Sequence, residues 1–249
     1  MACDYGERLK EPSRDGFVQQ ILYNCFAGNW PSSAQLKAYS PQQVIFRLER
    51  NSDSMYFLLA GAVKLSSVRA NGDEYATALM PKNSIFGAFP FLKRVNSIHS
   101  GQAIALAPSI LLSINVEQIE RMLIDNPEFV EALLHCLTAR NLESRWFVNL
   151  LATKHISARL EQFLVLLCQY FGVPQAKKIQ IDLALTNQDI AQLIGGVLDT
   201  VTMELGRLQD SGYISLDKGR IVVHRLEQLL ARCKLNNIRW NEHAPRFST

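Results

Sequence analysis

The side chains best suited to chemistry lie close together in the sequence, between Leu185 and His224. They carry hydroxyl, amide, carboxylate, thioether, aliphatic and cationic groups, which suit hydrogen bonds, ion pairs and apolar contacts. The candidates are Thr186, Asn187, Gln188, Leu198, Asp199, Thr200, Thr202, Met203, Arg207, Lys218 and Arg220. Such groups contact the phosphates and base edges of duplex DNA. Which partner they contact depends on the elements that position them.

The elements that would position these side chains follow from local signals. Thr186 is a predicted N-cap, with Asp189 three residues later in an arrangement that resembles a capping box. Gly195-Gly196 ends this helix, and a second helix is predicted from Leu198 to Asp210. A β-hairpin is predicted over residues 213–224. The order helix, glycine-containing turn, helix and hairpin is that of a winged helix-turn-helix.

The sequence before this stretch changes in texture twice. From Leu36 to Asn115, short apolar runs alternate with Gly, Pro, Asn and Asp, and Asn71-Gly72 is a hairpin turn signal. This pattern predicts an antiparallel sandwich or barrel. From Val116 the apolar period becomes helical, which predicts helices over Val116–Asp125 and from about Glu128 to Ala152.

The longer of these two helices carries a heptad pattern. Its apolar and small residues are spaced 4, 3, 4, 3, 4 and 3 apart, at Val130, Leu134, Leu137, Asn141, Ser144, Val148 and Leu151. A polar residue at an inner position, here Asn141, fixes register and oligomeric state. A second apolar face includes Leu133 and Phe147. We therefore expect one face to pack on the β domain and the other on the same helix of a homodimer.

Other classes of protein are excluded by simple observations. The chain has 249 residues with net charge +3, and all of the basic excess lies beyond residue 153. No P-loop, G-x-S-x-G motif or metal-spaced ligand set occurs, and His135 and Cys136 are helix neighbours that do not face each other. We therefore predict no enzyme and no bound metal. The absence of long apolar runs and of paired cysteine motifs predicts a cytoplasmic protein without a membrane partner.

The order of these elements resembles the Crp/Fnr regulator family. Runs such as Tyr56–Leu65, Ile85–Gly87, Ser157–Cys168 and Gly219–His224 resemble in particular the branch of the cyanobacterial global nitrogen regulator, NtcA. The resemblance implies an α+β fold. It consists of a cyclic-nucleotide-binding-like β-roll at residues 16–127, a dimerisation helix at 128–153 and a winged helix-turn-helix at 154–228. Residues 1–15 are a predicted disordered tail, and residues 229–249 are a C-terminal extension without an assigned role.

The DNA-contacting helix departs from the family pattern. Relatives place two arginines there, and the matching positions are Leu198 and Met203. The helix Leu198–Asp210 has three carboxylates and one arginine, which gives it net charge −2. This charge opposes binding to a polyanion. Two interpretations therefore stay open: a homodimeric transcription regulator with an altered DNA site, or a dimerising interaction module that antagonises a related regulator and has weakened DNA recognition.

The resemblance also implies an effector site. The turn after Phe86-Gly87 lacks the glutamate that binds cyclic nucleotides in relatives, so we do not expect cyclic AMP. The nitrogen-regulator branch instead implies an anionic effector such as 2-oxoglutarate, and no other cofactor. The implied contacts are Phe86, Gly87, Ala88, Phe89, His99 (with Arg94 as an alternative), Arg140, and Arg145 at a position where relatives have glutamate. The resemblance further implies RNA polymerase as a partner.

Overall fold

The computed structural model describes residues 34–47, 54–68, 72, 74–87, 101–176 and 178–233. The chain divides into two compact units, Met1–Leu65 with Leu79–Glu143, and Ser66–Ala78 with Ser144–Thr249. The predicted tail at 1–15 and the residues beyond 233 lie outside the described part. We describe each unit by itself.

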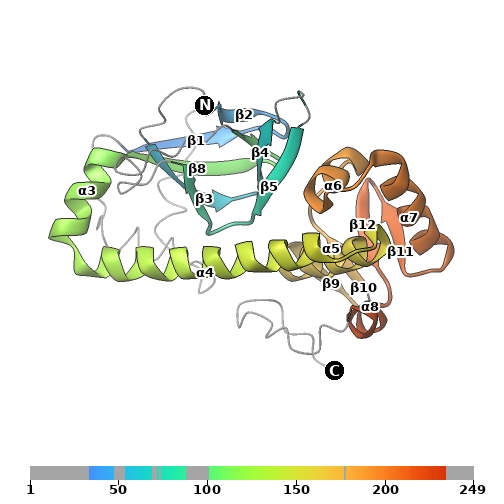
Figure 1. Cartoon of the computed structure of the whole chain (residues 1–249). Coiled ribbons are helices and arrows are strands. Elements are labelled where there is room, and N and C mark those ends of the chain that lie inside the picture. Colours follow the sequence, from blue (N-terminus) through green and yellow to red (C-terminus); the bar gives the residue numbers. More distant parts are fainter. Residues whose placement is uncertain are drawn as a thin grey trace. The chain divides into compact units, whose positions relative to one another are not determined.

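Eight strands in the N-terminal part of the chain form two four-stranded sheets (Figure 1). One sheet has the order β1-β8-β3-β6, with bounds Gln35–Tyr39, Ser109–Asn115, Ser54–Ala60 and Ile85–Gly87. The other has the order β2-β7-β4-β5, with bounds Val44–Arg47, Gln102–Ala105, Val63–Val68 and Glu74–Met80. Every strand pair of the first sheet is antiparallel. The predicted antiparallel β domain is confirmed.

Two helices follow the last of these strands. Helix α3 (Val116–Asp125) begins after Asn115, whose side chain accepts a hydrogen bond from the Glu117 amide. Helix α4 (Pro127–Ala152) begins one residue earlier than predicted, because Pro127 occupies the first helical position, where its missing N–H costs nothing. Leu133 and residues of α3 pack with Phe57 and Ile85 in one buried cluster. The start of α4 is thus fixed on the sheet β1-β8-β3-β6.

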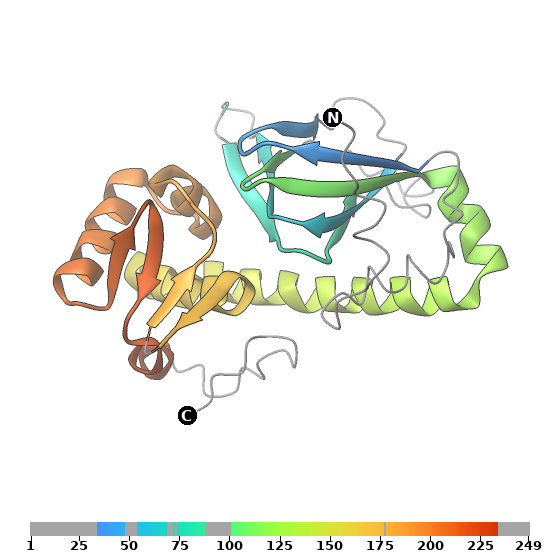
Figure 2. The same cartoon turned by 180° about the vertical axis from the view of Figure 1, so that it is seen from behind.

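The second unit contains the predicted winged helix-turn-helix (Figure 2). Its elements are α5 (Ile156–Phe171), β9 (Gly172–Gln175), β10 (Lys178–Ile181), α6 (Asn187–Ile194), α7 (Leu198–Asp210), β11 (Ile214–Asp217), β12 (Arg220–Val223) and α8 (Leu226–Arg232). The strand order is β11-β12-β10-β9. Leu160, Phe163, Leu164 and Leu167 of α5 are buried in this unit.

This unit contains one strand that local sequence signals do not indicate. Residues 172–175 follow α5 directly and form the edge strand β9, where Pro174 lies opposite Ile179. Proline is tolerated at a sheet edge because no neighbouring strand needs its missing N–H. The partner strand β10 ends at Ile181, and Leu183 just beyond it is still buried.

Candidate functional sites

Both ends of α6 are fixed by local chemistry. The Thr186 side chain accepts from the Asp189 amide at 3.0 Å and donates to the Asp189 carboxylate at 2.6 Å, while the Thr186 amide donates to the same carboxylate. This is the predicted capping box. Gly195 then ends α6 with φ +63°, in the left-handed region. The Thr186 hydroxyl, a predicted DNA contact, is already engaged within its own helix.

Arg159 of α5 binds the C-terminal end of α6. Its Nε donates to the Thr153 carbonyl at 2.7 Å, and one terminal nitrogen donates to the carbonyls of Ile194 and Gly195, both at 3.2 Å. Thr153 directly follows α4, so a single guanidinium connects the end of α4 with the end of α6. This role of Arg159 was not predicted, because the sequence shows only one arginine within the Ser157–Cys168 run.

Helix α7 has one buried face and one outward face. Val201, Leu205 and Leu208 are buried against the rest of the unit. On the opposite side lies what we call the outer stripe, which consists of Asp199, Met203, Gly206 and Asp210, spaced 4, 3 and 4 apart. Met203 is 48% exposed, and Leu198 in the first turn is 41% exposed. The predicted DNA-contacting residues of α7 thus include exposed apolar and acidic groups.

The polar side chains beside the outer stripe have partners within the unit. The Asn187 amide donates to the Thr202 hydroxyl at 3.1 Å, which joins α6 to α7. Arg207, the single cation of α7, donates to Glu204 at 2.6 Å. Gln188 and Asp199 are exposed, whereas Thr200 is partly covered.

The β11–β12 hairpin forms the predicted wing. Lys218 at its tip is exposed with φ +48°, and Arg220 pairs with Asp182 at 3.1 Å while remaining 47% exposed. The adjoining His224 ring contacts the Ser215 hydroxyl at 2.8 Å. Lys218 and Arg220 are therefore the wing cations that solvent or a phosphate can reach.

Of the predicted effector residues near the end of β6, Phe86 and Gly87 lie within the described part of the chain. Phe86 is buried, with its ring stacked on Tyr56 at 5.6 Å, so it is a core residue. Gly87 has φ +100°, and a Cβ there would lie 2.7 Å from the Ser54 carbonyl oxygen, so only glycine fits. Ala88, Phe89, His99 and the alternative Arg94 lie outside the described residues.

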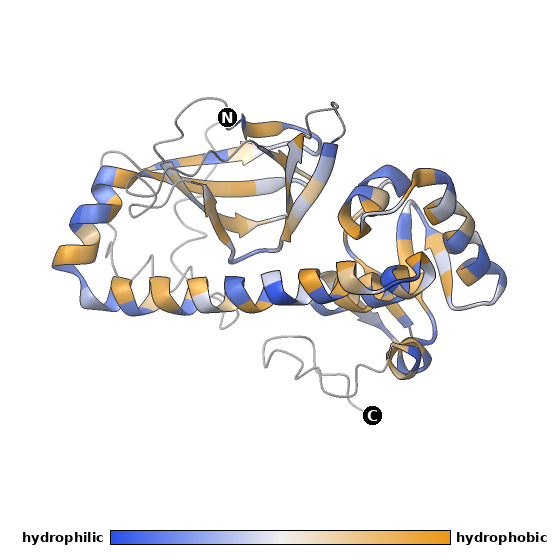
Figure 3. Cartoon of the chain, in the orientation of Figure 1, coloured by the Kyte–Doolittle hydropathy of each residue, from blue (hydrophilic) through white to orange (hydrophobic). Residues whose placement is uncertain are grey.

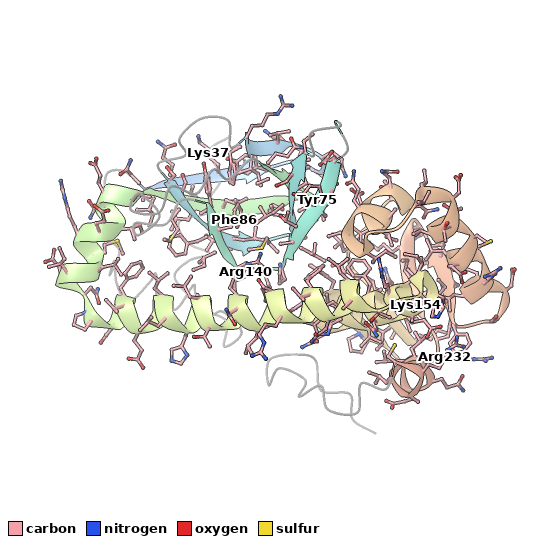
Figure 4. The ribbon with its side chains drawn as sticks, in the orientation of Figure 1. Lys37, Tyr75, Phe86, Arg140, Lys154 and Arg232 are labelled. Carbon is pink, nitrogen blue, oxygen red and sulfur yellow. The ribbon has the colours of Figure 1, made fainter. Side chains whose placement is uncertain are left out.

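Arg140 lies on the side of α4 that faces Phe86 (Figure 4), where it pairs with Glu143 at 3.3 Å. Both side chains are mostly buried. Burial, together with the Glu143 charge, raises the pKa of nearby Cys136 to about 11. Arg145 is exposed and lies about 140° further around the helix, since each residue turns the helix by about 100°. Glu143 was not foreseen as a partner of Arg140.

The heptad seam of α4, which comprises the seven residues from Val130 to Leu151 named above, is mainly exposed. Leu134, Val148 and Leu151 are 59%, 65% and 41% exposed, and Asn141 and Ser144 are also exposed. Val130 and Leu137 are partly covered, and Leu137 packs on the sheet cluster. Figure 3 shows apolar and polar bands alternating along α4. Of the second apolar face, Leu133 is buried in the sheet cluster, and Phe147 is also buried.

The described residues contain no cluster of three or more potential metal ligands. Burial raises the pKa of the Cys168 and Cys233 thiols to about 12, so neither is a ready thiolate near neutral pH. No helix in the described part has the length and apolar character that crossing a membrane requires.

Comparison with known proteins agrees with the two-part architecture. Residues 36–126 match the cyclic nucleotide-binding domain family, and residues 158–232 match the Crp-like helix-turn-helix domain family. Among solved structures, a CRP-family transcriptional regulator from Thermus thermophilus aligns with TM-score 0.67 at 15% identity, over 80% of this chain and 96% of the other. A CooA mutant from Carboxydothermus hydrogenoformans aligns with TM-score 0.68 at 17% identity, over 86% and 95%. These structural matches establish the fold.

Two curated relatives are much more similar in sequence. The global nitrogen regulator of Nostoc sp. is 40% identical over 213 residues, which cover 86% of this chain and 95% of the relative. That of Synechocystis sp. is 38% identical over 189 residues, covering 76% and 84%. Both relatives are named as regulators and neither as an enzyme, in agreement with the prediction made from the sequence. The chain belongs to the Crp/Fnr family of DNA-binding transcription regulators, in the branch of the cyanobacterial global nitrogen regulators.

Proposed function

We propose that this protein is a cytoplasmic homodimer that binds a two-fold symmetric DNA site and regulates transcription in response to an anionic metabolite of nitrogen or carbon status. The observation that carries the proposal is the exposed heptad seam on α4 beside a complete winged helix-turn-helix. A two-fold axis along the seam would present two copies of α7, each to one half-site, about one helical turn apart. RNA polymerase is the proposed partner on the bound promoter.

Helix α4 offers a matched control for a substitution in the seam. Leu142 is as exposed as Leu134, at 59%, but lies about 120° around the helix from the seam centre. Val148→Lys should shift the chain from dimer to monomer in sedimentation equilibrium, because it buries two unpaired charges in the proposed interface. Leu142→Lys should leave the dimer intact. Equal behaviour of both variants would refute pairing through the seam.

The proposed effector is a carboxylate or phosphate, with Arg140 as its cation. The exposed Arg145 would add positive charge from the partner helix, which favours an anion of higher charge than the one that relatives with glutamate accept. Isothermal titration with 2-oxoglutarate, phosphorylated metabolites and cyclic AMP tests this, and we expect no heat from cyclic AMP. Anion binding that survives Arg140→Met would exclude Arg140 as the effector contact.

DNA binding tests the proposal as a whole. The full-length protein should enrich specific duplexes from genomic fragments at low salt, and the enriched sites should be palindromic. The acidic charge of α7 favours one rival, a dimerising antagonist that binds a related regulator instead of DNA. Failure to enrich any duplex, together with capture of a related subunit, would support that rival and overturn the proposal.

A further inference from the structure

We propose that α7 recognises base pairs through apolar and acceptor groups: Met203 and Leu198 contact thymine methyl groups, and Asp199 accepts a hydrogen bond from the exocyclic amino group of cytosine or adenine. The proposal rests on the proposed DNA-binding role of the helix-turn-helix. It adds the chemical class of base edge that α7 selects.

The geometry of α7 limits which side chains can enter a groove. Val201, Leu205 and Leu208 are buried, so the outer stripe is the face left for DNA. The stripe contains two carboxylates, one thioether and one glycine, and no cation. Met203 is the exposed apolar group of the stripe, and Leu198, in the first turn of α7, is an exposed apolar group beside it. Direct contacts from the stripe to a base edge therefore use the Met203 thioether and the carboxylates.

The major groove offers each of these groups a distinct partner. Thymine presents a C5 methyl group, cytosine and adenine present amino donors, and guanine presents two acceptors. A carboxylate only accepts hydrogen bonds, so Asp199 pairs with an amino group and is repelled by the O6 and N7 atoms of guanine. An unbranched thioether adapts its shape to a methyl group. Thymine, with an amino-bearing base beside it, is therefore the preferred pattern.

Bidentate recognition of guanine by α7 is disfavoured by the position of its one arginine. Arg207 lies beside the outer stripe and donates to Glu204 at 2.6 Å. A contact between Arg207 and guanine would have to break this ion pair and leave the largely covered Glu204 carboxylate without its cation. The exposed wing cations Lys218 and Arg220 instead suit phosphates, which carry no direct sequence information.

Chemically modified duplexes test this directly. Full-length protein is used to select duplexes from a random pool, and the dissociation constant is then measured with each thymine replaced by uracil, which lacks only the methyl group. At one or more thymines per half-site the loss should be about fourfold for each methyl group. Replacing guanines by 7-deazaguanine, which lacks the N7 acceptor, should change affinity less than twofold.

Matched variants separate the roles of the residues. Met203→Ala should abolish the uracil effect at one thymine, while Gln209→Ala, an exposed residue outside the stripe, should preserve it. Met203→Arg should make binding sensitive to 7-deazaguanine, and Asp199→Asn should relax the exclusion of guanine at one position. These readouts compare ratios of affinities for two DNAs, so a general loss of stability does not imitate them.

The outcomes are distinguishable. A selected duplex whose affinity is unchanged by uracil at every thymine, or which loses more than tenfold with 7-deazaguanine, would refute the proposed specificity while the DNA-binding role stands. Absence of any enriched duplex would refute the DNA-binding role, and the specificity with it.

Discussion

Removing the Arg159 guanidinium should loosen the helix-turn-helix without emptying its core. Arg159→Met keeps the apolar stem and deletes the three hydrogen bonds to the carbonyls of Thr153, Ile194 and Gly195. The bonds to Ile194 and Gly195 share one nitrogen, and the bond to Gly195 is exposed. We therefore count two full contributions, each about 1.5 kcal/mol for a charged donor, and expect a loss of about 3 kcal/mol.

Urea unfolding of the full-length protein measures this loss. The variant should have a lower midpoint and an unchanged dependence of the unfolding free energy on urea concentration. Arg159→Lys should lose about half as much, because an ammonium keeps the charge beside the α6 terminus but lacks the planar fork. Arg121→Met removes an exposed arginine of α3 and should stay within about 0.5 kcal/mol of the parent. Amide hydrogen exchange shows where the stability is lost. In Arg159→Met, we expect exchange to become faster in α6 and α7 but not in α3.

Two outcomes would contradict a role of Arg159 in holding the turn. If Arg159→Met matched Arg121→Met in stability, the three carbonyls would be satisfied equally well by water, and the guanidinium would not hold the turn. If stability fell while exchange in α6 and α7 stayed unchanged, the residue would act through α5 alone.

Three further predictions follow from single contacts. Thr186→Ala removes a cap and the hydroxyl donor to the buried Asp189, so it should cost about 1–2 kcal/mol in urea unfolding, while Thr200→Ala should cost little. Glu143→Gln frees Arg140 from its carboxylate and should strengthen binding of the anionic effector several-fold by calorimetry; unchanged affinity would exclude competition between Glu143 and the effector. Burial, with the charges of Lys178 and Arg225, lowers the pKa of His224 below its ordinary 6.5. The unfolded chain therefore binds more protons than the folded one, and the free energy of unfolding falls as the pH drops through 6.5. His224→Gln should reduce this fall, and an identical pH profile of stability in the variant would contradict the prediction.

The sequence predicted elements where a local signal is strong. The capping box at Thr186, the glycine pair at 195–196 and the heptad spacing on α4 each depend on residues close in the chain, and the structure confirms those elements. Strand β9 was missed because Gly172 and Pro174 are ordinarily turn residues, and only pairing with β10 makes them a strand. Tertiary pairing of this kind overrides local propensity.

The candidate sites show the same division between local and long-range information. The exposed faces of α4 and α7 follow from helical periodicity. By contrast, the bonds from Arg159 to Ile194 and Gly195 span 35 and 36 residues, and the Glu161–Arg232 pair, at 2.6 Å on a buried carboxylate, spans 71. No spacing rule in one sequence connects such positions. Even the local Arg140–Glu143 pair escaped notice, because its significance depends on burial.

The negative charge of α7 makes the proposed dimer important for the affinity for DNA. With the proposed methyl and acceptor contacts, a helix of net charge −2 would bind a single half-site weakly, since phosphate attraction supplies much of the affinity of DNA-binding proteins. Linking two such helices makes the second contact intramolecular, so binding becomes strong only when both half-sites fit at once. A regulator built this way depends steeply on the geometry of its dimer helices. A small shift at the α4 seam, transmitted through Thr153 and Arg159, would therefore change DNA occupancy more than it would in a protein whose single half-site contact is already strong.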